Sequence, residues 1–135
     1  MAARLARPYV EAGIVANDRA EALAFWHDLL GFPIEGEVSF PGLTVIRLDL
    51  GGSTLRICVP DQPAGHVAPA GGFAEATGLR YLTLYVNNLD ELVSAIEAAG
   101  YPVPFPPREI RPGHRVAQVQ DGRGVTLELV ETAAG

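Results

Sequence analysis

The sequence predicts an α+β fold built from two tandem units, each with the order strand, helix and three strands. Three observations support this prediction. The helix-like run EALAFWHDLL is followed by GFPI at residues 31–34, and the similar run DELVSAIEAA is followed by GYPV at residues 100–103. Strand-like runs flank both helices in the same order, and a segment rich in Pro, Gly and Ala separates the two blocks. At 135 residues the chain has the size of a single domain, residues 1–135.

The first unit is expected to span residues 9–60. Its opening run YVEAGIVA, residues 9–16, is short and rich in β-formers, which predicts a strand. A helix follows, because Asn17 or Asp18 can accept a hydrogen bond from the free N–H groups at its start. Gly31 is expected to end this helix at the C′ position. Three more strands are then predicted, at about residues 34–39, 43–50 and 53–59.

The second unit is expected to span residues 79–131, after a linker at residues 61–78. LRYLTLYVNN predicts its first strand and LDELVSAIEAA its helix, which Gly100 ends. A Pro-interrupted extended piece follows, and the runs HRVAQVQ and VTLELVE predict the last two strands. The two units can be superposed with one residue of slack inside the helices.

Alternation along each strand divides its side chains between two faces. One face of each unit is apolar and should pack against a helix: Val10, Ala12, Ile14, Ala16, Leu55, Ile57 and Val59 in the first unit, and Leu82, Leu84, Val86, Val125, Leu127 and Leu129 in the second. The opposite faces are mixed, which fits a partly enclosed cleft for a small molecule better than open solvent. They carry Glu11, Gly13, Val15, Thr54, Arg56 and Cys58, then Tyr81, Thr83, Tyr85, Thr126, Glu128 and Val130.

Composition excludes several classes of protein. The net charge of −6 and the scattered Lys and Arg residues argue against a nucleic-acid partner. Apolar runs are too short for a membrane span, so we expect no membrane partner. The single cysteine, Cys58, cannot form an internal disulfide, which fits a reducing compartment. We therefore expect a cytoplasmic protein.

The repeated units, the motif EAGIVANDRAEALAFWHDLLGF and the ending DGRGVTLELVE together resemble the vicinal oxygen chelate superfamily. This family includes glyoxalases, ring-cleaving dioxygenases, epimerases and bleomycin-type resistance proteins. The resemblance covers nearly the whole chain. It implies that each unit curls its mixed sheet into a half-barrel with the helices on the convex face, that the partner is a small molecule, and that the chain forms a homodimer.

The resemblance also implies four inward-facing positions at which family members hold a metal, and here they carry Glu11, Arg56, Tyr81 and Glu128. Only Glu128 is of the usual type. Arg56 stays protonated and has no lone pair to offer. At ~4 Å from a divalent ion its repulsion would be about 8 kcal/mol at an effective dielectric constant near 20. We therefore expect no metal in the usual place and no other cofactor, with Arg56 acting as a fixed cation beside Glu11.

These four residues could act in metal-independent proton transfer next to a carbonyl, as in an isomerase, an epimerase or a lyase. Glu128 or Glu11 would be the base, while Arg56 and Tyr81 would stabilise the charge that grows on oxygen. Glu11 and Arg56 could instead form a plain surface ion pair worth ~0 to 1 kcal/mol.

Two other functions remain open. The protein could sequester a drug or metabolite without catalysis, receiving a cationic group on Glu11 and Glu128. It could also be a glyoxalase-like lyase with a divalent metal on Glu11, Glu128 and a histidine.

Further residues are candidates for contact with the substrate. Tyr85, Cys58, His114, Phe40 and Phe105 are expected to bind it, with His114 lying beside Arg111 and Arg115 in the sequence. Phe73 and Trp26 could also wall an apolar pocket, although the place of Trp26 on the apolar stripe of its helix favours a core position. His66, in the linker, could fold over the cleft as a lid.

Overall fold

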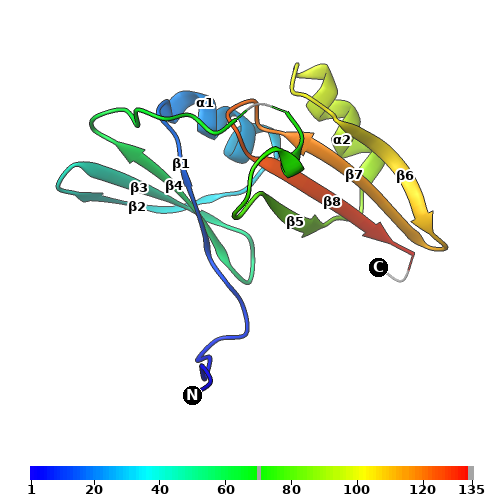
Figure 1. The fold of residues 1–135 in the computed structure, drawn as a ribbon, viewed down its shortest axis with the longest axis horizontal. Helices are drawn as coiled ribbons and strands as arrows, with labels where there is room; N and C mark the ends of the chain where they lie inside the picture. The colour runs from blue at the N-terminus through cyan, green and yellow to red at the C-terminus, as the bar shows by residue number, and fades with distance from the viewer. Residues whose placement is uncertain (70, 134–135) are drawn as a thin grey trace. The chain divides into compact units, whose positions relative to one another are not determined.

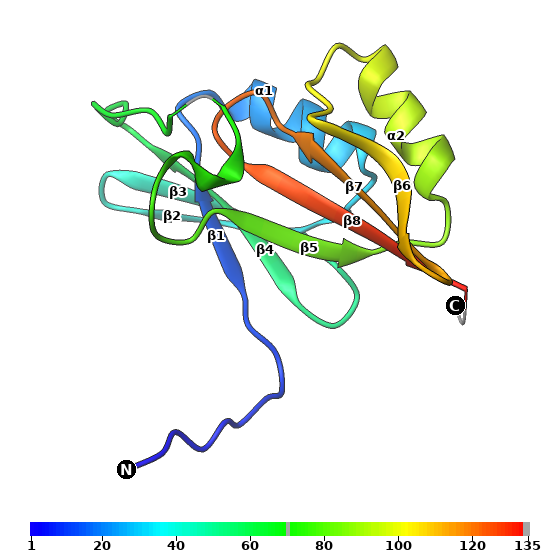
Figure 2. The same ribbon diagram turned by 45° about the vertical axis from the view of Figure 1, so that its right-hand side comes forward.

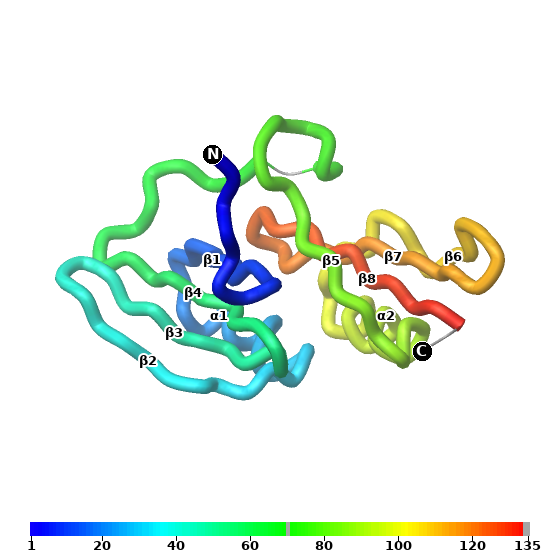
Figure 3. Tube along the Cα trace, turned by 90° about the horizontal axis from the view of Figure 1, so that it is seen from below, coloured from blue at the N-terminus to red at the C-terminus, as the bar shows by residue number. Residues whose placement is uncertain are grey.

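The computed structural model describes residues 1–69 and 71–133 and divides into two compact units, Met1–Ala64 and Gly65–Gly135. Each unit contains a four-stranded sheet with one parallel and two antiparallel pairings. The strand order is β1-β4-β3-β2 in the first unit and β5-β8-β7-β6 in the second, as Figure 3 shows. This matching topology confirms the predicted repeat and the α+β class.

The first unit begins with a strand shorter than predicted. Its elements are β1 (Ala12–Val15), α1 (Arg19–Leu23), the π-helix η1 (Ala24–Leu29), β2 (Ile34–Phe40), β3 (Leu43–Asp49) and β4 (Thr54–Pro60). Figure 1 labels α1 and the four strands. The ladder between β1 and β4 starts at Ala12 and Leu55. Val10 precedes this ladder and is 84% exposed, so the prediction that it packs against the helix is wrong. The prediction started the strand too early because the residues of a strand do not show where its partner strand ends.

The helix of the first unit starts and ends as predicted but contains an irregularity. Asp18 caps it, because its carboxylate accepts a hydrogen bond from the Glu21 N–H at 3.1 Å. In η1 the Leu30 N–H donates to the Phe25 carbonyl, five residues back, as a π-helix requires. This wider turn accommodates the one residue by which the first helix region exceeds the second. Gly31 then follows with a φ of 82°.

The strands and the helix of the second unit lie at the expected places. They are β5 (Tyr81–Tyr85), α2 (Leu89–Ala98), β6 (Phe105–Arg111), β7 (His114–Gln120) and β8 (Thr126–Thr132). A short 3₁₀ helix, η2 (Phe73–Glu75), was not expected and lies in the segment predicted as a linker. Figure 2 shows α2 lying across one face of this sheet. Gly100, with a φ of 92°, follows the helix, which confirms the predicted stop.

The core of each unit lies between its helix and its sheet. Buried side chains from α2 and the sheet include Val93, Ile96, Val119, Leu127 and Leu129. In the first unit Trp26 is 1% exposed and packs edge-on against Phe25, with 4.8 Å between ring centroids. Trp26 is therefore a core residue, as its place on the helix stripe predicted. Each such buried side chain contributes about 1.5 to 3 kcal/mol.

The segment predicted as a linker is bound at both of its ends. Asn17 holds Ala64 of the first unit through two hydrogen bonds, accepting from its N–H at 2.7 Å and donating to its carbonyl at 3.2 Å. In the second unit Gln120 donates to the Gly71 carbonyl at 2.8 Å, and Arg80 donates to the Phe73 carbonyl at 2.9 Å. These contacts fix Phe73 beside the second sheet. In the described chain, helices are too short or too polar to cross a membrane.

Candidate functional site

Arg56 and Glu11 form an ion pair in the first unit. The Arg56 Nη2 atom lies 2.8 Å from Glu11 Oε1, and the two side chains are 48% and 25% exposed. Arg56 stands opposite Gly13 in the ladder of β1 and β4, just as Glu128 stands opposite Thr83 in the ladder of β5 and β8. This shared register confirms the predicted correspondence of Arg56 with Glu128.

A second arginine flanks Arg56 on the neighbouring strand. Arg47 of β3 pairs directly with Arg56 of β4 in the ladder, so the two side chains share a face. Glu35 lies 3.7 Å from Arg47, measured from Oε1 to Nη2. Each arginine thus has its own carboxylate, which offsets the repulsion expected between like charges on adjacent strands.

Cys58 and Phe40 also belong to the first unit. Cys58 is half-buried on β4 opposite Val15, and Phe40 ends β2 with 54% of its surface exposed. Neither residue lines the cavity of the second unit described below.

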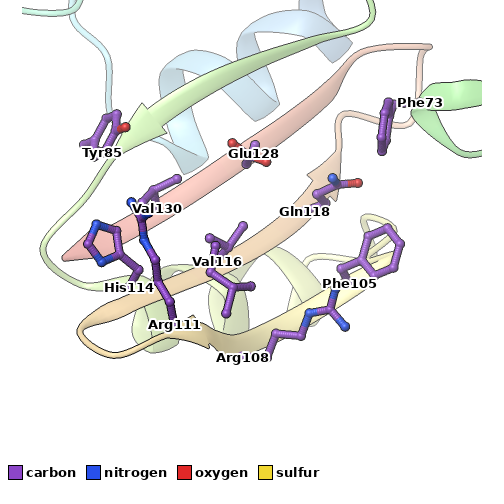
Figure 4. A pocket seen from close by; sticks show the side chains of 11 residues that line it. Phe73, Tyr85, Phe105, Arg108, Arg111, His114, Val116, Gln118, Glu128 and Val130 are labelled. Atoms are coloured by element: carbon purple, nitrogen blue, oxygen red, sulfur yellow. The ribbon is translucent and has the colours of Figure 1, made fainter.

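A cavity of about 390 Å³ lies on the face of the second sheet that carries Glu128 (Figure 4). This volume is within the range of small-molecule sites. Three aromatic, three aliphatic, three basic and two further polar side chains line it: Phe73, Tyr85 and Phe105; Ile110, Val116 and Val130; Arg108, Arg111 and His114; and Gln118 and Glu128.

Five residues singled out from the sequence therefore meet in one cavity: Glu128, Tyr85, His114, Phe105 and Phe73. Alternation of the strand faces was sufficient to find Glu128 and Tyr85. Tyr81, on the same strand as Tyr85, does not line the cavity, and its ring instead packs edge-on against Phe73 at 5.3 Å between centroids. His66 lies in an exposed segment without regular secondary structure and is not a lining residue either.

The carboxylate of Glu128 is held at the centre of the cavity wall. The Thr83 hydroxyl, on the neighbouring strand, donates a hydrogen bond of 3.1 Å to Glu128 Oε1. On the other side Glu128 faces Gln118 of β7 across the ladder. The amide of Gln118 has no side-chain hydrogen bond within the described part of the chain, so its donors and acceptor are available to a ligand.

Two β-bulges on β6 explain why Arg108 and Ile110 escaped the sequence analysis. The pairing of β6 with β7 shifts by one residue between Phe105 and Arg108, and again between Glu109 and Arg111. Each shift turns the following side chains to the other face. Ile110 and Arg111 can therefore both line the cavity although they are adjacent, which regular alternation forbids.

On the helix side of the same hairpin, Arg115 has acidic partners. Its guanidinium donates to both carboxylate oxygens of Asp90, at 2.8 and 2.9 Å, and lies 3.7 Å from Glu131. The hydrogen bonds from Arg115 lower the pKa of Asp90 below its ordinary value, and they raise that of Arg115. Glu131 in turn accepts from the Leu89 N–H at the start of α2. This network fastens α2 to the sheet behind the cavity.

The side chains do not fit the divalent metal that the resemblance to metal-dependent family members implies. Across residues 1–69 and 71–133, His, Cys, Asp and Glu side chains do not gather in groups of three or more that could hold an ion. One of the implied positions carries Arg56, which cannot ligate.

Comparisons with known proteins agree on the family. The family model described as "Glyoxalase/Bleomycin resistance protein/Dioxygenase superfamily" matches residues 8–129. A glyoxalase family protein from Enterococcus faecalis is 26% identical with a TM-score of 0.69, and the match covers 91% of this chain and 94% of that one. No protein of curated function matches the sequence.

Two further structures resemble the fold. A glyoxalase family protein from Bacillus cereus is 18% identical with a TM-score of 0.78, and the match covers 96% of both chains. A glyoxalase I mutant from Zea mays is 16% identical with a TM-score of 0.74, over 89% of this chain and 43% of that one.

Proposed function

The chain belongs to the glyoxalase/bleomycin resistance protein/dioxygenase superfamily, and we propose that within it this protein is a metal-independent enzyme that moves a proton next to a carbonyl group. The reaction would be an isomerisation, an epimerisation or a lyase step. The observation that supports the proposal is Glu128, a carboxylate fixed by Thr83 on the wall of a cavity with mixed apolar and polar lining. Such cavities are the usual form of small-molecule sites.

In the proposed step a Glu128 oxygen takes a proton from the carbon next to the carbonyl. The C–H electron pair becomes the new C=C bond, and the carbonyl π pair moves to oxygen, giving an enolate. Gln118, across the ladder from Glu128, is placed to donate an amide N–H to that oxygen. The carboxyl group then returns the proton to the same carbon, which exchanges or inverts that centre. If this carbon carries a hydroxyl, the proton can instead go to the former carbonyl carbon, while the hydroxyl proton moves to the enolate oxygen and the hydroxyl carbon becomes the new carbonyl. The roles predicted from the sequence, Glu11 as an alternative base and Arg56 and Tyr81 as stabilisers of charge, stay predictions and are not part of this step.

Deuterium exchange tests this step without knowledge of the natural substrate. In D₂O the protein should exchange hydrogen next to the carbonyl of small oxo acids and ketones, which NMR detects. Glu128→Gln should lower the exchange rate by about 100-fold or more, because a general base contributes ~10² to 10⁴. Glu97→Gln, which makes the same change on the exposed surface of α2, should not. Equal exchange by wild type and Glu128→Gln would refute the base role.

Sequestration without catalysis is the alternative function that the aromatic walls favour. A binding protein with the same cavity would show no exchange with any compound, and Glu128→Gln would weaken its affinity for a neutral ligand only modestly. The charges of the cavity disfavour the cationic ligand that this alternative first suggested, since Arg108 and Arg111 line it together with Glu128.

We also propose that the chain works as a homodimer, which the family resemblance suggests. Exposed apolar side chains on the cavity rim support this, since Tyr85 is 76% and Ile110 56% exposed. Light scattering should then give twice the chain mass of 14.3 kDa. A monomer at working concentration would contradict the proposal.

A further inference from the structure

Arg108 and Arg111 differ from Arg115, the other arginine of the β6–β7 hairpin. Arg115 is paired with Asp90, whereas neither Arg108 nor Arg111 has a carboxylate partner within residues 1–69 and 71–133. The Arg108 guanidinium lies 5.4 Å from the centroid of the Phe105 ring. Glu109, between them in the sequence, accepts a hydrogen bond from the Gly113 N–H at 3.0 Å and so serves the turn.

Two arginines without acidic partners are unexpected beside a cavity of a chain with a net charge of −6. Nearby carboxylates would normally compensate them. A guanidinium presents donors in a planar fork that matches a carboxylate, which makes arginine the usual side chain for binding this group. His114 adds ring nitrogens next to Arg111, its direct partner in the ladder. This end of the cavity therefore has the chemistry of an anion site.

The strand register orders the cavity into three levels. Phe105, Gln118 and Glu128 share the first level; Arg108, Val116, Val130 and Tyr85 share the second; and Arg111 and His114 share the third. Phe105 shares the level of Glu128 in the register, and in Figure 4 the Glu128 side chain lies between Phe73 and Phe105 on one side and Arg111 and His114 on the other. The first and third levels are four residues apart on β7, which corresponds to roughly 13 Å of backbone. The long Arg111 side chain can cover part of that distance.

From this order we propose that the cavity binds an aryl oxo acid, with its aromatic ring at Phe73 and Phe105 and its carboxylate at Arg111 and His114. The carbonyl group then lies near Gln118, and the neighbouring methylene faces Glu128. Two carbon–carbon bonds separate the carboxylate carbon from the reacting carbon. The position of the carbonyl rests on the proposed function, whereas the charge and the ring of the ligand follow from the cavity itself.

The probe 4-oxo-4-phenylbutanoate has this arrangement of groups. Its neutral counterpart is 4-oxo-4-phenylbutanamide, and 4-oxopentanoate lacks the ring. Titration calorimetry or NMR should show about 10- to 100-fold weaker binding of the amide than of the acid, because a charge-assisted hydrogen bond is lost. Arg111→Gln should weaken binding of the acid by the same factor and leave binding of the amide unchanged. Arg108→Gln should have a smaller effect, because its guanidinium rests on Phe105.

Arg4→Gln is the matched control, since it removes the same charge from the exposed N-terminal segment of the other unit and should leave the affinity for the acid unchanged. Equal affinity for acid and amide, or an undiminished affinity in Arg111→Gln, would overturn the anion site. Equal binding of 4-oxopentanoate would overturn the ring site. Failure of all three compounds to bind at millimolar concentration would overturn the whole inference.

The same samples separate this inference from the proposed function. Charge-dependent binding of the acid without deuterium exchange at its methylene supports the ligand class and refutes the base role of Glu128. Exchange that depends on Glu128 but ignores the carboxylate of the probe supports the base role and refutes the ligand class.

Discussion

At Arg56 a guanidinium lies 2.8 Å from the Glu11 carboxylate, yet nearly half of the arginine side chain is exposed. Water screens such a pair, so its contribution to folding is ~0 to 1 kcal/mol. The sequence offered two interpretations of this pair, a plain ion pair and a catalytic cation. Both predict the same small contribution to the stability of the fold. They differ only in their effect on chemistry.

Substitution of Arg56 by Gln distinguishes them. We expect the free energy of unfolding, measured by urea denaturation, to fall by about 1 kcal/mol or less. If Arg56 stabilises charge on oxygen, the deuterium-exchange rate should fall at least about tenfold, since one such donor contributes ~10² to 10³ in related cases. An unchanged exchange rate together with a small stability change would reduce the pair to a surface contact.

At the same scale, strand alternation predicted which residues share the face around Glu128. It placed Glu128, Val130 and Tyr85 together, and all three line the cavity. It could not place Arg108 or Ile110, because the bulges that turn these side chains inward depend on pairing with β7 and leave no signal in the residues themselves.

Among the elements, α2 shows how the sheet is supported behind the site. Arg115 of β7 holds Asp90 in the first turn of the helix, and Glu131 of β8 accepts from the Leu89 N–H. Two neighbouring strands thus fasten the same helix end.

This fastening should appear in the acid stability of the protein. Because Arg115 lowers the pKa of Asp90, the folded state binds a proton there less readily than the unfolded state. The stabilisation is thus complete above the ordinary pKa of 3.8 and is lost as the pH falls through the lower folded value. Asp90→Asn should reduce the slope of unfolding free energy against pH in that acidic window. An identical slope in the variant would show that Asp90 is not linked to folding.

The helix of the first unit shows what the sequence could tell about an element. Comparing the repeats revealed one surplus residue, and the structure accommodates it in η1. The sequence did not show how this residue is accommodated. A π-turn, a longer loop and an extra helical residue all give the same number of residues between the two repeated motifs. Similarly, the first strand was predicted three residues too early, since Tyr9 and Val10 are β-formers without a partner strand.

For the whole molecule, the repeat made the fold predictable. Gly31 and Gly100 both adopt positive φ at a helix end, and both sheets have the same strand order. The cavity was less predictable: Phe73 was named as a possible pocket wall, but it lies in a segment that was predicted as a linker, so its position could not be derived. Its position depends on hydrogen bonds to Arg80 and, through Gly71, to Gln120, which residue patterns do not reveal.

The proposed metal independence concerns the whole protein and can be tested on it directly. After treatment with a chelator and gel filtration, we expect the deuterium-exchange rate to stay within about twofold of the untreated value, because none of the proposed steps uses an ion. Elemental analysis of the same sample is the control. Loss of exchange with recovery on adding one divalent metal would instead support a lyase with unusual ligands.

We propose that the second-unit cavity is the working site, with Glu128 between an aromatic end and a cationic end. A crystal structure of Glu128→Gln protein with 4-oxo-4-phenylbutanoate would show whether this is so. We expect the phenyl ring against Phe73 and Phe105, the carboxylate within hydrogen-bond distance of Arg111, and the methylene facing position 128. Ligand bound against Arg56 instead, or bound in the cavity with its ring and carboxylate reversed, would contradict it.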